Sequence, residues 1–307
     1  MATELGPRAM FVAGGTDLFP KLKRRQFDVE TLIGLDFLDR SITPDYVGAG
    51  ATLADIARHE ELEGYAQAAG LVSSPPLRNA GTAGGNLCVD TRCNYYDMSY
   101  EWRKAIGYCM KKDGDICLVA PSSPRCWAVS SSDTGPMAIA LAATVLLTGA
   151  RGEREAPVAS LYRDDGIEYM AKQPAEVVTG LRLKKAANSN SAYVKLRRRG
   201  SIDFPIAGAA VWLQMDGDTV VGCRIALSAV ASHPLEAKAA AEFLVGKRVE
   251  PETVAAAAEL AAKPAKPLDN ADLAHFWRKR MVRVVVEQAI NQAAIKFGGS
   301  TVKLSTV

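Results

Sequence analysis

Short apolar runs separated by turn residues dominate the first half of the chain. The run AMFVAGG at 9–15 ends in two glycines, which predicts a buried strand followed by a tight turn. TLIGL at 31–35 predicts a second strand, and the segment 136–149 predicts a helix that is followed by a strand. Thr52 and Asp55 have the spacing of a capping box, which predicts the start of a helix. This alternation predicts a mixed α/β first domain.

The pattern changes after AANSNS at 186–191, a small and polar segment that we interpret as a linker. Runs rich in apolar and β-branched residues then predict strands at 192–198, 207–215 and 219–230. The turn sequence MDGD at 215–218 predicts a hairpin between the last two. Helical patterns follow at 234–246, 252–262 and 269–295. A small sheet covered by helices is therefore predicted for this half.

With 307 residues, the chain is long enough for two domains. We predict an α+β protein with a first domain at 1–186, which contains an insertion at 90–127, and a second domain at 190–307. Hydrophobic residues make up 48% and charged residues 23%, as in soluble globular proteins. No apolar run approaches the ~18 residues of a membrane span, and the N-terminus lacks the regions of a signal peptide, so a cytoplasmic location is predicted.

The net charge of +3 is too small to indicate binding to nucleic acid or to a membrane. The one dense basic run, Arg197 to Arg199, is interpreted as the solvated end of a strand, with a partner or phosphate contact as the alternative. His59, His233 and His275 are scattered, and we interpret each as structural or facing solvent. The sequence therefore indicates no acid–base machinery.

Five of the six cysteines lie between residues 88 and 126. Cys93, Cys109, Cys117 and Cys126 form no CxxC pair, which argues against a zinc finger or ribbon. Four thiolates on a long polar loop are typical of an iron–sulfur cluster, whose metal bonds would order the loop. The alternative is a set of free buried cysteines. Cys88, on or beside a predicted strand, and Cys223, within one, are interpreted as core thiols.

Two glycine-rich stretches, AGGTDLFP at 13–20 and RNAGTAGGNL at 78–87, can bring backbone N–H groups close to an anion. Neither matches GxGxxG or the P-loop, so a Rossmann site is not indicated. Together they favour a nucleotide cofactor held on loops, and two tight turns are the alternative. Arg78, beside the second stretch, could pair with a phosphate or cap a turn.

Four motifs in order carry a resemblance to a known family: AGGTDL, RNAGTAGGNL, SSD before a proline at 131–136, and KLRRRGSIDFP at 195–205. The chain resembles the FAD-binding subunit of the molybdenum hydroxylases over nearly its whole length. The insertion with the four cysteines resembles that of the 4-hydroxybenzoyl-CoA reductase β subunit, which binds an extra [4Fe-4S] cluster. One departure is that family members usually begin with a strand and helix before the first glycine loop, which here comes early.

The resemblance implies a two-subdomain α/β FAD-binding domain of the molybdenum hydroxylase flavoprotein type, with a C-terminal domain of a small sheet and helices. It implies that FAD is held by Phe11, Val12, Ala13, Gly14, Gly15, Thr16, Asp17, Leu18, Val72, Thr82, Gly85, Asn86, Val89, Asp133 and Lys195. It implies that the cluster ligands are Cys93, Cys109, Cys117 and Cys126.

The function implied is electron transfer rather than substrate binding. Electrons would pass from a ferredoxin-like donor through [4Fe-4S] and FAD to a [2Fe-2S] small subunit and a molybdenum large subunit, where 4-hydroxybenzoyl-CoA loses its hydroxyl group. These subunits would form a heterotrimer that is expected to dimerise. One alternative is the FAD subunit of another molybdenum hydroxylase, acting on a heterocycle or an acyl-CoA. Another, from a different class, is a zinc-stabilised interaction protein.

Overall fold

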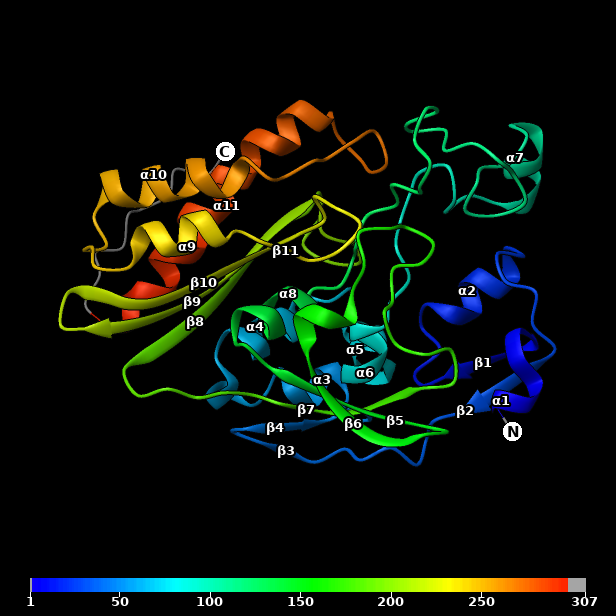
Figure 1. Cartoon of the computed structure of the whole chain (residues 1–307), viewed down its shortest axis with the longest axis horizontal. Coiled ribbons are helices and arrows are strands. Elements are labelled where there is room, and N and C mark those ends of the chain that lie inside the picture. Colours follow the sequence, from blue (N-terminus) through cyan, green and yellow to red (C-terminus); the bar gives the residue numbers. More distant parts are fainter. Residues whose placement is uncertain (1, 298–307) are drawn as a thin grey trace.

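The computed structural model describes residues 2–297 and contains three sheets (Figure 1). The chain begins with α1 (Ala2–Leu5), η1 (Gly6–Arg8), β1 (Ala9–Val12), α2 (Leu18–Lys23) and β2 (Thr31–Gly34). The strands β1 and β2 pair in parallel. The strands predicted within 9–15 and 31–35 are confirmed, but β1 is only partly buried and not buried as predicted, because it lies in a sheet of only two strands. The first glycine loop joins β1 directly to α2.

An antiparallel sheet of five strands forms the base of the first domain, in the order β3-β4-β7-β5-β6. Its strands are β3 (Ile42–Thr43), β4 (Tyr46–Gly48), β5 (Thr144–Gly149), β6 (Gly152–Pro157) and β7 (Val177–Arg182). Short helices cover it: α3 (Leu53–Ile56), η2 (Glu60–Leu62), α4 (Gly64–Gly70), α5 (Pro75–Ala80), α6 (Ala83–Leu87), α8 (Thr134–Ala140) and η3 (Val158–Leu161). The predicted cap of α3 is confirmed, since the Thr52 hydroxyl accepts from the Asp55 N–H at 3.1 Å.

The second domain is an antiparallel sheet in the order β11-β10-β9-β8, covered by three helices. Its elements are β8 (Ser189–Leu196), β9 (Ala207–Asp216), β10 (Thr219–Ser228), β11 (Leu235–Glu236), α9 (Lys238–Leu244), α10 (Pro251–Ala262), α11 (His275–Ala294) and η4 (Ile295–Phe297). Figure 1 shows the three helices together on one side of this sheet, with the first domain on the other. The predicted α+β class and the predicted hairpin between β9 and β10 are confirmed.

The central strands of this second sheet are buried on both faces. Because side chains alternate along a strand, Ala210 and Trp212 of β9 join the core of the first domain. Their neighbours Val211 and Leu213 join the core under α9, α10 and α11. One sheet therefore contributes to the two large hydrophobic cores, while a third, small cluster lies in the insertion.

Three boundaries differ from the prediction. Residues 189–191, expected in a linker, begin β8, because pairing with β9 and a bond from Asn190 to the Ala293 carbonyl override their turn propensity. The helix expected from residue 234 begins at Lys238, since Leu235 and Glu236 pair with β10. The helix expected from residue 269 begins at His275.

The insertion, residues 90–127, has little regular structure. Its one helix among the described residues is α7 (Tyr100–Ala105), which is capped by Ser99. Figure 1 shows the insertion at the upper right, between α2 and the segment that leads into α11. No helix in the described part of the chain is both long enough and apolar enough to cross a membrane.

Candidate functional site

The two glycine-rich stretches touch each other in the folded chain. A Cβ atom at Gly14 would lie 1.9 Å from the Ala80 carbonyl oxygen and 3.0 Å from the Gly81 nitrogen. Gly15 has a φ of +67°, a conformation that favours glycine. Glycine at these two positions therefore lets the first loop turn tightly against the second stretch.

Backbone N–H groups of the first loop are available for a ligand. The N–H groups of Gly14, Gly15 and Thr16 meet no hydrogen-bond acceptor within residues 2–297. Successive unpaired N–H groups at a glycine-rich turn form a concave anion site. This arrangement fits the diphosphate of a dinucleotide such as FAD. That residues 11–18 hold it stays a prediction.

Replacing Gly14 by alanine is expected to weaken FAD binding roughly tenfold or more, because overpacking against a backbone carbonyl costs about 1–3 kcal/mol. Fluorescence titration of the flavin-free protein with FAD measures the change. Gly200→Ala is the matched control, since a Cβ at Gly200 meets nothing within 4 Å. Wild-type affinity in Gly14→Ala would contradict the role assigned to the close contact between the stretches.

The second stretch is joined to the Ser-Ser-Asp segment by one side chain. The Asn86 side-chain oxygen accepts from the Thr134 hydroxyl at 2.7 Å, from the Thr134 N–H at 3.1 Å and from the Ser132 hydroxyl at 3.0 Å. Thr82 caps α6 by accepting from the Gly85 N–H. The two motifs, 46 or more residues apart in sequence, are thus fixed to each other.

Asp133 and Lys195 form a buried ion pair between the two domains. Their charged atoms lie 2.8 Å apart, and the side chains are 3% and 1% exposed. The other Asp133 oxygen accepts from the Tyr193 hydroxyl at 2.8 Å, and Lys195 also donates to the Leu71 carbonyl. Burial raises the pKa of Asp133, while Lys195 and Tyr193 oppose that rise. Both carboxylate oxygens have protein partners, so contact between Asp133 and FAD stays a prediction.

The remaining predicted residues lie around these contacts. Phe11 and Val12 are in β1, Leu18 begins α2, and Val89 follows α6. Arg78 caps the turn before α5, since its guanidinium donates to the Val72 carbonyl at 2.8 Å. Cys88 lies at the end of α6 and not on or beside a strand as predicted, because the glycine stretch continues into a helix. The predicted position of Cys223, in β10, is confirmed.

The four clustered cysteines line one cavity. Their side chains are buried, with 4–7% exposed, and the cavity is lined by Cys93, Cys109, Cys117, Cys126 and mainly apolar neighbours. None of the six cysteines forms a disulfide. Cys93 and Cys126, which are 33 positions apart in sequence, thus line the same cavity. No disulfide holds them there.

The cluster ligation implied by the resemblance stays a prediction. Among the described residues, no group of three or more His, Cys, Asp or Glu side chains is arranged to hold a metal ion. Burial raises the pKa of the Cys93 thiol to about 12 and that of the Cys126 thiol to about 11, which favours the protonated form of these two groups. Iron binding would have to displace those protons. The Ala128 N–H donates to the Cys126 sulfur at 3.4 Å.

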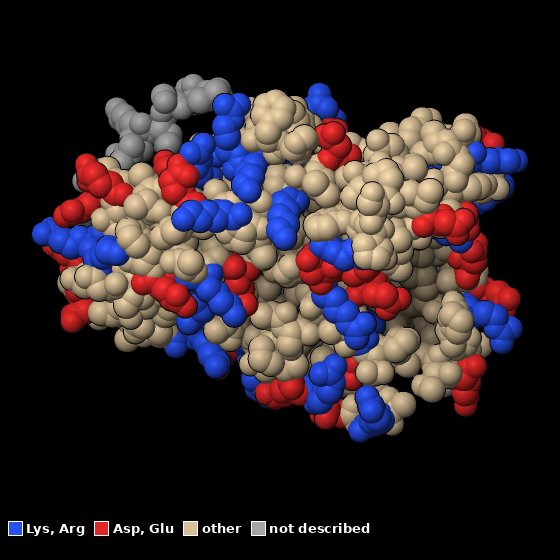
Figure 2. Space-filling model, turned by 45° about the horizontal axis from the view of Figure 1, so that its top comes forward, with Lys and Arg blue, Asp and Glu red and all other residues tan. Residues whose placement is uncertain are grey.

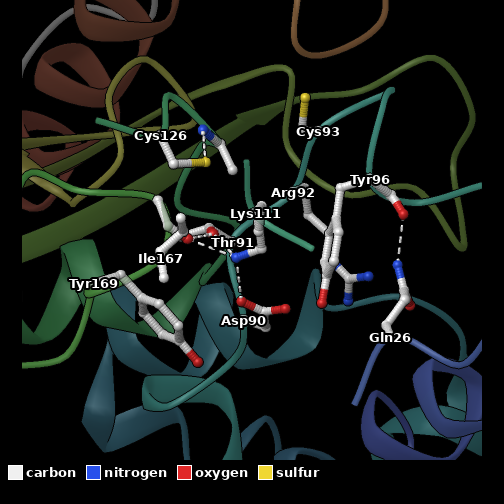
Figure 3. A network of polar contacts seen from close by, with 12 residues as sticks. Gln26, Asp90, Thr91, Arg92, Cys93, Tyr96, Lys111, Cys126, Ile167 and Tyr169 are labelled. Carbon is white, nitrogen blue, oxygen red and sulfur yellow. Dashed lines mark hydrogen bonds and ion pairs between the residues drawn. The ribbon is translucent and has the colours of Figure 1, made fainter. Parts of the chain in front are cut away.

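A buried polar network, missed by the sequence analysis, lies between the cavity and the first loop (Figure 3). Asp90 accepts from Lys21 of α2 at 2.5 Å and from Lys111 of the insertion at 2.7 Å. Burial would raise the pKa of Asp90, but the two ammonium groups hold it well below its usual range. Both lysines face the Tyr96 ring, at 4.6 and 4.8 Å from its centroid.

This network links the loop after β1 to the cysteine insertion. Arg92, next to Cys93, pairs with Asp17 of the first loop and with Asp97. Figure 3 shows Lys111 reaching Asp90 and Thr91 from the side of Cys93 and Cys126. Charged residues within a cysteine-rich loop read as solvated, so the sequence held no signal for their burial. The close approach of Gly166 to Cys126 was also missed, because nothing in the local sequence indicates it. A Cβ atom at Gly166 would lie 2.6 Å from the Cys126 sulfur.

Comparisons with known proteins identify the family of the chain. A family model described as the FAD binding domain in molybdopterin dehydrogenase matches residues 1–183. A second, described as the CO dehydrogenase flavoprotein C-terminal domain, matches residues 191–293. The chain is 27% identical to the carbon monoxide dehydrogenase medium chain of Hydrogenophaga pseudoflava, over 94% of this chain and 91% of that protein.

Two further similarities extend the comparison. The chain is 30% identical to the aldehyde oxidoreductase FAD-binding subunit PaoB of Escherichia coli, over 84% of this chain and 86% of that one. The solved carbon monoxide dehydrogenase of Hydrogenophaga pseudoflava superposes with a TM-score of 0.77 at 26% identity, covering 96% of this chain and 92% of that chain. The chain therefore belongs to the FAD-binding medium subunits of the molybdenum hydroxylase family, which includes the carbon monoxide dehydrogenase medium chain.

Proposed function

We propose that this chain is the electron-transfer subunit of a molybdenum hydroxylase-type complex and that it holds a [4Fe-4S] cluster besides FAD. Its FAD-binding part would span 1–186, with the cluster in the insertion at 90–127, and a C-terminal part would span 190–307. The relatives are named as medium chains and FAD-binding subunits. We therefore place the chain with a molybdenum large subunit and a [2Fe-2S] small subunit.

The observation that carries the cluster is the shared cavity of Cys93, Cys109, Cys117 and Cys126. Four buried thiols without disulfides, in a loop with one short helix, are explained if metal–thiolate bonds close that loop. The loop would exclude water from the cluster, and the Ala128 N–H would hold the Cys126 sulfur in place. A thiolate-bound cluster carries single electrons at a low potential.

The protein's part in flavin binding would be orientation. Gly14, Gly15 and Thr16 would offer N–H donors to the diphosphate, while Asn86 would hold the second stretch in register with the segment before α8. The bound flavin supplies exchange of one or two electrons. Electron exchange by the flavin requires no acid or base from the side chains of this chain. The three histidines each lie against a carboxylate instead.

Two classes of substrate are candidates for the complex. The names of the relatives favour a hydroxylase or dehydrogenase that acts on another small molecule, such as carbon monoxide, an aldehyde or a heterocycle. The cysteine cavity favours a second candidate, the reductase of 4-hydroxybenzoyl-CoA with a ferredoxin-like donor, because a low-potential entry site suits the difficult reduction of an aromatic ring. Assays of the whole complex with each substrate class separate the two.

Cofactor analysis of anaerobically purified protein tests the proposal. We expect about four irons and about four acid-labile sulfides per chain together with one FAD, and an EPR signal after reduction. FAD without iron would leave an ordinary flavin subunit and overturn the cluster. Zinc without either cofactor would favour the zinc-stabilised interaction protein instead.

A further inference from the structure

A surface groove lies between the cysteine insertion and the start of α11. It has a volume of about 710 Å³ and is formed by two segments far apart in sequence. We call it the lysine groove and define it by Pro124 and Trp127 of the insertion and by Lys266, Leu268, Phe276 and Lys279 of the second domain. Neither the family motifs nor the flavin loops include these residues.

The walls of the lysine groove are bonded to the cysteine loop. Asn270, which is buried, donates to the Trp127 carbonyl at 2.5 Å, next to Cys126. The Asn270 carbonyl accepts from the Asn94 N–H at 2.9 Å, next to Cys93. The Ala120 N–H, on the groove's insertion side, donates to the Cys117 carbonyl at 3.2 Å. A molecule seated in the groove would therefore rest against the segments that carry three of the four thiols.

Two lysine ammonium groups, those of Lys266 and Lys279, give the groove a positive charge. No Asp or Glu is among its lining residues, and the Lys266 and Lys279 side chains have no carboxylate partner within residues 2–297. Of the nearby carboxylates, Asp269 lies 3.5 Å from His275, which also lines the groove, and Asp272 pairs with Arg198. Figure 2 shows lysine and arginine side chains gathered on the face of the molecule that carries α10 and α11.

The groove also offers an exposed aromatic side chain. Phe276 is 61% exposed, beside the lysines, and the Trp127 ring is held by Arg125, whose guanidinium lies 3.6 Å from the ring centroid. An aromatic anchor within a rim of unpaired charge is typical of a protein contact. A groove with these lining residues suits the small interface of a transient redox partner, under about 1,200 Å².

We propose that the lysine groove is the docking surface for a small acidic electron-donor protein. The proposal rests on the proposed function, because the donor would deliver its electrons to the cluster held by the adjacent thiols. Acidic side chains of the donor would meet Lys266 and Lys279, and an apolar patch at its centre would cover Phe276. Such complementary charge raises the association rate and makes it sensitive to salt.

Stopped-flow reduction of the assembled complex by a reduced, acidic bacterial-type ferredoxin tests this surface. In Lys266→Glu/Lys279→Glu we expect the second-order rate constant at low ionic strength to fall by about tenfold or more, and its salt dependence to disappear. Lys184→Glu/Lys185→Glu, with the same change of charge on exposed lysines of the other domain, should keep the wild-type rate. Phe276→Ala should lower the rate without changing its salt dependence.

The controls separate the possible failures. Reduction by dithionite, which needs no docking, should be equal in all variants. An equal loss in both double variants, or no loss in either, would overturn the docking surface while leaving the cluster intact. Failure of the groove variant to assemble with the molybdenum subunit would make the groove a subunit interface and would also overturn it. Absence of iron from the wild-type complex would overturn the proposed function, and this inference with it.

Discussion

Replacing Cys117 by serine is expected to remove most of the iron from the protein and leave its FAD in place. Cys117 is 4% exposed and lines the cavity with the other three thiols. A serine hydroxyl is a poorer ligand than a thiolate for iron, and loss of one ligand of four leaves the cluster incomplete. The glycine loops hold no residue of this cavity, so the flavin site should not change. Iron, sulfide and flavin analysis measures both effects.

Cys223→Ser is the matched control for this substitution. Cys223 lies in β10 and takes no part in the cavity, so its serine variant should keep both cofactors.

In Cys117→Ser, loss of the cluster should slow the reduction of the flavin by a protein donor by at least an order of magnitude. This corresponds to an increase of about 1.4 kcal/mol or more in the activation barrier. Full iron content in Cys117→Ser, or an unchanged rate of reduction by the donor, would contradict the proposed electron path through the insertion.

Replacing Lys195 by methionine is expected to destabilise the protein by about 3–5 kcal/mol at neutral pH, because it leaves the Asp133 carboxylate buried without a cation. Among residues 2–297, the Tyr193 hydroxyl would then be the one hydrogen-bond donor left to the Asp133 carboxylate. The midpoint of unfolding in urea measures the loss. The double variant Lys195→Met/Asp133→Asn removes the charge as well and should recover most of the stability. An equal loss in the single and double variants would show that the ion pair is not the cause.

The same variant has an expected pH dependence. Burial already raises the pKa of Asp133, and removing Lys195 takes away the main group that opposes this rise. An acid whose pKa is higher in the folded than in the unfolded state binds more protons when folded, so its penalty grows as pH rises between the two values. The stability difference between wild type and Lys195→Met should therefore be smaller at pH 5 than at pH 8.

Local patterns in the sequence were enough for much of the fold. Apolar runs that end in glycine marked β1, and the turn residues Gly217 and Asp218 marked the hairpin between β9 and β10. The helix boundary at His275 was missed because the buried contacts of Asn270 with residues 94 and 127 hold its segment out of the helix. Such contacts join distant parts of the chain and leave no trace in local periodicity.

The residue types of the site were predictable from the sequence, but the contacts between its side chains were not. Cysteine spacing suggested that the four thiols share one site, and they line one cavity. The burial of Lys21 was not predictable, because LFPKLK reads as an ordinary helix with lysines at its surface. Only the folded chain places Lys21 against Asp90 and Lys111, residues 69 and 90 positions away in sequence.

The strand β9 belongs to both large hydrophobic cores, and this limits how the chain can be recombined. Trp212 faces the first domain, and Val211 faces the helices that follow. Consider a chimera that takes residues 191–293 from a relative. The face of its sheet that contacts the first domain would have evolved to pack against a different first domain. Crossovers at the family boundary should therefore often give chains that fold poorly, even where both parents are stable. Exchanges that keep β8, β9 and α8 from one parent should succeed more often, because they preserve the shared interface.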